Sequence, residues 1–218
     1  MSRLSGPSVP PRSGGIARQL VVLLHGVGAD GNDLIGLAPA LARLLPHAAF
    51  VAPNGPDPCD MAPFGYQWFS LQDRRPEALL PGVQAAAPLL DAFLDEELAR
   101  YGLDDRRLAL VGFSQGTMMS LYVAPRRAAP MAAVLGFSGA LLGAEALRSE
   151  AVSRPPVFLI HGDADEIVPV GALATAVAGL QAADIPVRFE IRPGLPHAID
   201  PEGIAHGGAF LAAAFEGG

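Results

Sequence analysis

Residues 107–123 read RLALVGFSQGTMMSLYV, and this stretch decides the fold. A short apolar run, RLALV, leads into Gly112-Phe-Ser-Gln-Gly116, and a helix-like run follows. A nucleophile elbow reverses the chain sharply from strand to helix, so small residues must flank the serine, whose hydroxyl lies above the sheet. Unpaired backbone N–H groups at a helix N-terminus also stabilise an oxyanion. We therefore predict that Ser114 is a nucleophile placed between a strand and a helix.

A second Gly-x-Ser stretch shows how much the context matters. Gly136-Phe-Ser138-Gly139 also follows an apolar run, but its second glycine comes one residue too early. No clear helical pattern follows it, so we interpret it as a turn at a strand end. The prediction for Ser114 therefore depends on the strand before it and the helix after it as well as on the motif.

Short apolar runs alternate with helix-like segments along the chain, which is typical of a mostly parallel sheet flanked by helices. The predicted strands are 19–24, 48–52, 107–111, 132–137, 157–160 and 187–191. The predicted helices are 33–45, 82–101, 116–124, 170–182 and 203–215. Nearly continuous apolarity indicates interior strands that are buried on both faces. The predicted fold class is α/β.

Two segments fall outside this alternation. Residues 1–17 are rich in Pro, Gly and Ser and are expected to form a tail or an edge hairpin. Residues 53–81 hold six prolines and show no convincing element, yet they carry Trp68, Phe69 and other large apolar side chains. Long loops of this kind are often functional. We expect their apolar residues to serve either a substrate cavity or a partner surface, such as that of a homodimer.

The amino-acid composition limits the number of domains, the partners and the cellular compartment to be expected. The 218 residues are 50% apolar and 17% charged, which supports a single folded domain over 1–218 with a sizeable core. The net charge is −7, and all 15 basic residues are Arg, which cluster no further than three short pairs, so nucleic acid is not expected as a partner. The single cysteine, Cys59, suits a reducing compartment. Neither an export signal nor an apolar run of ~18 residues is found, which predicts a cytoplasmic protein without stable membrane insertion.

A serine hydroxyl becomes a good nucleophile only with a base and a carboxylate that orients the base. Asp163 and Asp165 follow the apolar run 157–160, and His197 follows the run 187–191. Both places lie beyond strand ends, where open α/β sheets carry their sites. The order Ser, Asp, His matches α/β-hydrolase triads. We predict His197 as the base and leave Asp163 and Asp165 as competing acids.

Other polar residues near these strand ends have simpler interpretations. His25 and His161 each precede a glycine at a strand end and are expected to make structural hydrogen bonds. His161, Asp163, Asp165 and Glu166 together resemble a metal-binding cluster, but carboxylates this close in a turn occur without metal. We therefore expect no metal ion.

The segment 25–31 reads HGVGADG and contains Gly-x-Gly-x-x-Gly, so a dinucleotide-binding site is the main rival interpretation. That site needs an acidic residue at the end of the next strand, where the chain reads Pro-Asn-Gly at 53–55. An acyl-transfer site uses the same segment as a turn. Its N–H, that of Val27, would meet the N–H of Gln115 at the oxyanion. The second interpretation is favoured, and no cofactor is expected.

Five blocks carry a resemblance to a known family. They are LLHGVGADGNDL (23–34), QWFSL (67–71), GFSQGTMMSL (112–121), HGDADEIVP (161–169) and LPH (195–197). With these blocks in order, the chain from about Leu20 onward resembles the phospholipase/carboxylesterase family of α/β hydrolases, which includes acyl-protein thioesterases and small bacterial carboxylesterases. The resemblance implies an α/β-hydrolase fold, with a mostly parallel central sheet and no large lid domain.

The resemblance also implies roles for individual residues. Ser114 corresponds to the nucleophile, Asp165 to the triad acid and His197 to the base, while Val27 and Gln115 correspond to the oxyanion N–H donors. The tryptophan block resembles the family's WFD segment at the acyl site. The residues expected to hold the acyl or aryl part are Trp68, Phe69, Met118, Ile167 and Leu195. For Met118 and Ile167, plain core packing is the alternative.

Two departures from the family pattern bear on the substrate. Ser70 replaces the usual aspartate, and Glu166 stands where proline often follows the acid. The implied activity is hydrolysis of carboxylic esters, short- to medium-chain or aryl, through an acyl-enzyme on Ser114. Lysophospholipase or acyl-protein thioesterase activity is the alternative. A non-catalytic binding module on the hydrolase fold is a third interpretation.

Overall fold

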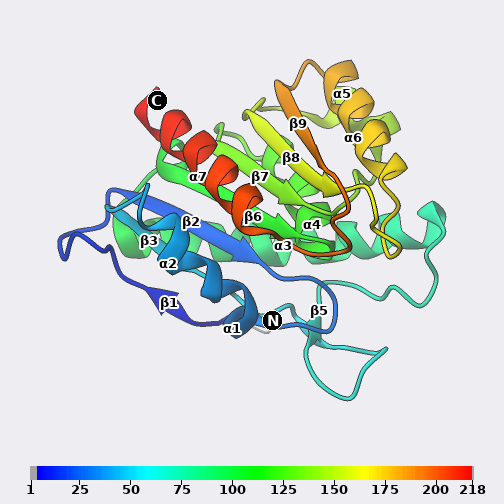
Figure 1. Ribbon diagram of the computed structural model, residues 1–218, viewed down its shortest axis with the longest axis horizontal. Coiled ribbons are helices and arrows are strands. Elements are labelled where there is room, and N and C mark those ends of the chain that lie inside the picture. Colours follow the sequence, from blue (N-terminus) through cyan, green and yellow to red (C-terminus); the bar gives the residue numbers. More distant parts are fainter. Residues whose placement is uncertain (1–3, 218) are drawn as a thin grey trace.

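The computed structural model describes residues 4–217 and contains a seven-stranded sheet in the order β1-β3-β2-β6-β7-β8-β9 (Figure 1). The strands of this sheet are β1 Ser8–Val9, β2 Gln19–Leu24, β3 Ala48–Val51, β6 Leu108–Phe113, β7 Ala133–Phe137, β8 Val157–Gly162 and β9 Val187–Arg192. All neighbouring pairs are parallel except β1 with β3. A separate antiparallel pair joins β4 (Asp57–Pro58) to β5 (Tyr66–Gln67).

Helices cover both faces of the sheet (Figure 1). The helices are α1 Gly31–Leu34, α2 Ala38–Leu41, α3 Pro76–Tyr101, α4 Gln115–Val123, α5 Ala144–Glu150, α6 Gly171–Ala182 and α7 Pro201–Glu216, with 3-10 turns η1 Ile35–Leu37, η2 Asp105–Arg107 and η3 Ala124–Arg126. One apolar cluster packs α3 to α6 against one face, and a second packs α1, α2 and α7 against the other. This is the predicted α/β-hydrolase architecture. No helix within residues 4–217 is long and apolar enough to cross a bilayer.

The central strands are buried as their apolarity predicts. In β2, Leu20 to Leu24 are all fully buried, and the first five residues of β6 are buried too. The prediction of an interior strand was wrong for β9, which forms the edge of the sheet. Phe189 is 56% and Ile191 47% exposed there. The alternation of apolar and polar residues in VRFEIR is typical of a strand with a solvated face, which is what an edge position requires.

The helix predicted over 33–45 is broken into α1, η1 and α2. Pro39 lies in the first turn of α2, and because proline has no N–H it cannot continue the hydrogen-bond ladder of a preceding helix. The helix α5 was missed because its seven residues bury only Leu147 and therefore show no periodicity.

The segment 53–81 holds more structure than expected. The pair of β4 and β5 lies within it, and α3 starts at Pro76, six residues before the predicted start. Proline fits the first turn of a helix because the N–H there has no helical partner in any case. In the segment predicted as a tail or an edge hairpin, β1 forms an edge strand with β3. Residues 1–3 of that segment lie outside the described part.

Candidate active site

Ser114 sits on the turn between β6 and α4 in a strained backbone conformation. Its φ is +52° and its ψ is −114°, a region that residues other than glycine rarely adopt. A Cβ on Gly112 would lie 2.4 Å from the amide nitrogen of Thr117, and one on Gly116 would lie 1.8 Å from the carbonyl oxygen of Leu24. Both glycines are therefore required for α4 to start this close to β6 and β2, as the motif predicted.

We expect Gly116→Ala to destabilise the protein by about 3 kcal/mol or more, because the added methyl group overlaps the backbone of β2 and has no flexible side chain to displace. Urea denaturation followed by circular dichroism would measure the change in the free energy of unfolding. Gly171→Ala is the matched control, since its Cβ would meet no atom within 4 Å at the first residue of α6. The control should shift the free energy by less than about 0.5 kcal/mol. Equal stability of the two variants would contradict the steric argument.

The structure brings Asp165 and His197 together at the ends of β8 and β9. Nδ1 of His197 lies 2.7 Å from Oδ2 of Asp165, whose side chain is fully buried. The other carboxylate oxygen, Oδ1, accepts hydrogen bonds from the N–H groups of Ile167 (2.9 Å) and Val168 (2.8 Å). With Nδ1 directed at the carboxylate, Nε2 of His197 is left to act on a substrate or a hydroxyl.

The surroundings of Asp165 favour its ionised form. Burial acts to raise the pKa of this carboxyl group, but the hydrogen bond from His197 and those from the two backbone N–H groups outweigh it and hold the pKa below its ordinary value. A depressed carboxyl pKa contributes to stability above the pKa of the unfolded chain, and the contribution is lost as the pH falls through the folded value. Asp165 is therefore a carboxylate at neutral pH and can orient an imidazole.

The other candidates from the sequence have structural partners. Asp163 accepts a hydrogen bond from the N–H of Gly194 at 2.6 Å and so ties two loops together. His25 Nε2 accepts from the N–H of Gly55 at 2.8 Å, and His161 Nε2 lies 2.8 Å from the carbonyl oxygen of Val168. The predicted structural hydrogen bonds of His25 and His161 are therefore present.

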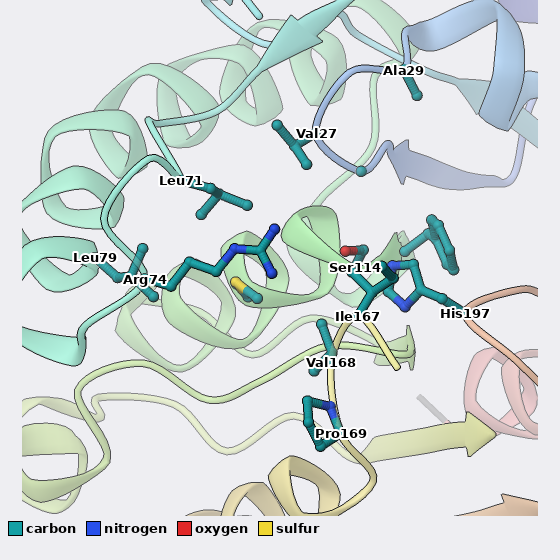
Figure 2. Close-up of a pocket in the computed structure, with 13 residues that line it drawn as sticks. Val27, Ala29, Leu71, Arg74, Leu79, Ser114, Ile167, Val168, Pro169 and His197 are labelled. Carbon is teal, nitrogen blue, oxygen red and sulfur yellow. The ribbon is translucent and has the colours of Figure 1, made fainter. Parts of the chain in front are cut away.

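A cavity of about 400 Å³ opens beside Ser114. Ser114 and His197 both line it, and Figure 2 shows them at the same end of the cavity. The ring centroid of Phe113, another lining residue, lies 4.8 Å from that of His197. Most of the remaining wall is apolar: Val27, Ala29, Leu71, Leu79, Met118, Ile167, Val168 and Pro169. Ser114 therefore faces a largely apolar space of ligand size.

Two backbone N–H groups are available for an oxyanion next to Ser114. Gln115 is the first residue of α4, and Val27 lines the cavity beside Gly26. Within residues 4–217, neither N–H has an acceptor. A Cβ on Gly26 would lie 3.3 Å from Cβ of Ser114, so the 26–27 turn packs directly on the elbow. This placement suits the predicted pair of oxyanion donors.

At α1, the backbone N–H groups that a dinucleotide site would use already have acceptors. The carboxylate of Asp30 accepts from the N–H groups of Asn32 and Asp33, and the side chain of Asn54 accepts from that of Gly31 at 2.8 Å. These donors are the ones a pyrophosphate would need. The glycine-rich segment is instead held as a turn, since the N–H of Gly28 donates to the carbonyl of Tyr66.

Comparison with known proteins agrees with this geometry. Residues 12–214 match the phospholipase/carboxylesterase family. The chain belongs to that family. The esterase YpfH of Escherichia coli K12 is 30% identical over 184 residues, which is 84% of this chain and 78% of that protein. Acyl-protein thioesterase 1 of Kluyveromyces lactis is 31% identical over 71% of this chain and 72% of its own. The crystal structure of esterase PE8 superposes with a TM-score of 0.92 at 46% identity, covering 96% of this chain and 98% of that one.

For this member of the phospholipase/carboxylesterase family, the predicted acyl site needs correction. Met118 and Ile167 line the cavity, whereas Trp68, Phe69 and Leu195 do not. Trp68 is 1% exposed, and its indole N–H donates to the carbonyl of His25 at 3.0 Å. The backbone of Leu195 packs beside the end of β8, and its carbonyl accepts from the N–H of Ala164 just beyond that strand.

The tryptophan block instead serves to hold the elbow. The side-chain oxygen of Gln115 accepts from the N–H of Trp68 at 2.9 Å, and its amide nitrogen donates to the carbonyl of Phe69 at 2.7 Å. Gln115 is fully buried, so both bonds are shielded from water. Gln115, the residue after Ser114, thus fastens the 53–81 segment to α4.

Three cavity residues on that segment were missed from the sequence. Leu71, Arg74 and Leu79 line the cavity opposite Ser114 (Figure 2). The sign in the sequence that could have revealed them is a charged residue between two leucines, in a segment that was already expected to be functional. The spacing of these three residues predicted no helix or strand, however, because Arg74 lies in the irregular stretch just before α3.

Proposed function

We propose that the protein is a serine carboxylesterase that hydrolyses small-molecule carboxylic esters through an acyl-enzyme on Ser114. Nε2 of His197 takes the hydroxyl proton as Oγ attacks the carbonyl carbon, and Asp165 stabilises the resulting imidazolium. The N–H groups of Val27 and Gln115 hold the oxyanion. The imidazolium then protonates the departing alcohol, and water, activated by the same histidine, releases the acid.

The observation that carries the proposal is the hydrogen bond of 2.7 Å between His197 and a buried, ionised Asp165, at a cavity that Ser114 also lines. A binding module would need neither the carboxylate nor the strained elbow. Strain of this kind persists when the surrounding structure over-determines it, and it clusters at active sites.

The size of the cavity supports short- to medium-chain or aryl esters as substrates. Its volume of about 400 Å³ lies near the lower end of the range for small-ligand sites. The apolar wall suits the hydrocarbon part of such an ester. The single cysteine and the small-molecule substrate fit a cytoplasmic enzyme. A homodimer would use exposed apolar residues of the 53–81 segment such as Phe64, which is 73% exposed.

Hydrolysis of p-nitrophenyl esters from acetate to palmitate tests the proposal. We expect the highest kcat/KM at acetate to hexanoate, because longer chains exceed the cavity. A maximum at palmitate would instead favour lysophospholipase or acyl-protein thioesterase activity, the latter being the named activity of the Kluyveromyces lactis relative. A fluorophosphonate probe followed by peptide mass spectrometry should modify Ser114. Ser138, which is 1% exposed at the end of β7, should stay unmodified. Absence of both turnover and labelling would favour the binding module.

A further inference from the structure

The cavity beside Ser114 holds a charged side chain that the proposed reaction does not use. Ten of its thirteen lining residues are apolar or glycine, and the other three are Ser114, His197 and Arg74. Figure 2 shows the side chain of Arg74 extending from the stretch before α3 into the cavity, on the side facing Ser114. The acyl-transfer steps need no cation at this place.

Arg74 has no partner of its own within residues 4–217. The nearest carboxylate along the chain, that of Asp73, is taken by Arg75 through contacts of 2.5 to 3.0 Å. Structural arginines of this protein behave differently. Arg127, for example, is 7% exposed and touches three carboxylates at 2.5 to 2.7 Å. The guanidinium of Arg74 is thus free to bind a ligand.

The place of this guanidinium suits an anionic ligand. Arg74 is exposed to solvent, which screens its charge in part, but among the mostly apolar lining residues its guanidinium is the permanently charged group to which a ligand carboxylate can bind. The net charge of −7 disfavours the binding of anions to the surface in general, so an anion needs a local positive partner such as Arg74. A guanidinium presents a planar fork of N–H donors that fits a carboxylate through two parallel hydrogen bonds.

We infer that Arg74 selects esters that carry a carboxylate remote from the bond that is cleaved, such as monoesters of dicarboxylic acids. This inference rests on the proposed function and narrows its substrate class. The ester carbonyl lies at Ser114, the intervening carbons lie on the apolar wall, and the distant carboxylate pairs with Arg74. Since the pairing exists both before and during the reaction, it lowers KM more than it raises kcat.

Paired substrates test the inference. Monomethyl adipate carries the anion on the acyl side, and its amide, monomethyl adipamate, is a neutral analogue of nearly equal shape. On the alcohol side, 4-acetoxybenzoate and 4-acetoxybenzamide form the same comparison. The quantity to measure is the ratio of kcat/KM between the charged and the neutral ester in each pair. Arg74→Met removes the charge but keeps an apolar stem of similar reach. Arg43→Met is the control, because it removes the same charge at an exposed position outside the cavity.

In at least one pair, we expect Arg74→Met to lower this ratio by about 10- to 100-fold, mainly through KM, as for the loss of a charge-assisted hydrogen bond. The ratio for Arg74→Lys should lie between those of the wild type and Arg74→Met, because lysine keeps the charge but lacks the planar fork of N–H donors. Arg43→Met should leave the ratio within about twofold of the wild type. Equal ratios in the wild type and Arg74→Met for both pairs of esters would overturn the inference. Arg74 would then only pack against the apolar wall.

A binding measurement separates this result from failure of the proposed function. Calorimetric titration with adipate should show binding to the wild type and at least tenfold weaker binding to Arg74→Met, whether or not any ester is hydrolysed. If neither the charged nor the neutral esters are turned over while adipate binds through Arg74, the esterase proposal fails and the anion site stands. If adipate binds both proteins equally or neither, the anion site is overturned.

Discussion

Ser114→Ala is expected to lower kcat/KM for p-nitrophenyl butyrate by about 10⁵-fold or more. Removing the nucleophile of a triad removes the whole covalent route, and the activity that remains comes from the oxyanion donors and substrate binding alone. The loss should appear in kcat, because the apolar wall that holds the acyl group is untouched. Steady-state rates at several ester concentrations measure both constants.

The fold should survive this change. Ser114 is 5% exposed, and the contacts that fix its turn come from the backbone, including its N–H to the carbonyl of Phe137 at 2.9 Å. Alanine and serine have similar difficulty with a φ of +52°. Circular dichroism and urea denaturation should therefore match the wild type to within about 1 kcal/mol. A variant that folds and keeps more than a tenth of the wild-type kcat/KM would refute the role of Ser114.

The sequence predicted those parts of the fold that depend on local pattern. Short runs rich in apolar residues located the six parallel strands, and the steric demands of Gly112 and Gly116 located the elbow. The break at Pro39 was readable from its missing N–H but was overlooked. The alternation of apolar and polar residues in β9 indicates a solvated face, but this sign was overlooked and β9 was wrongly placed in the interior.

In the candidate site, too, some residues were predicted well from the sequence and others were not. The predicted triad residues lie together because the carboxyl ends of parallel strands meet at one edge of the sheet. The cavity wall was predicted less well, because long-range packing decides which side of a loop faces inward. Trp68 turns into the core, where it meets His25, while Arg74 turns into the cavity. Neither direction is encoded in the spacing of residues along the segment 53–81.

Asp165→Asn is expected to lower kcat for the same ester by about 10⁴-fold. An amide keeps the shape of the carboxylate and can still accept from the N–H groups of Ile167 and Val168. It no longer stabilises an imidazolium, however, and it permits the tautomer of His197 that presents a protonated Nε2 to Ser114. Because binding of the ester does not use the carboxylate, KM should change by less than about threefold. Steady-state kinetics of the purified variant would measure both effects.

Asp163→Asn is the matched control, since it makes the same change two residues away on the other candidate acid. In the described part of the chain its carboxylate accepts from the N–H of Gly194 alone, and Asp163 is not among the cavity residues, so kcat should stay within about threefold of the wild type. The comparison therefore decides between the two aspartates that the sequence left in competition. A large loss in Asp163→Asn together with a small loss in Asp165→Asn would contradict the assignment drawn from the hydrogen bond at 2.7 Å. Equal losses with equal destabilisation would show that both aspartates act by holding their loops, which the urea midpoints of the two variants would reveal.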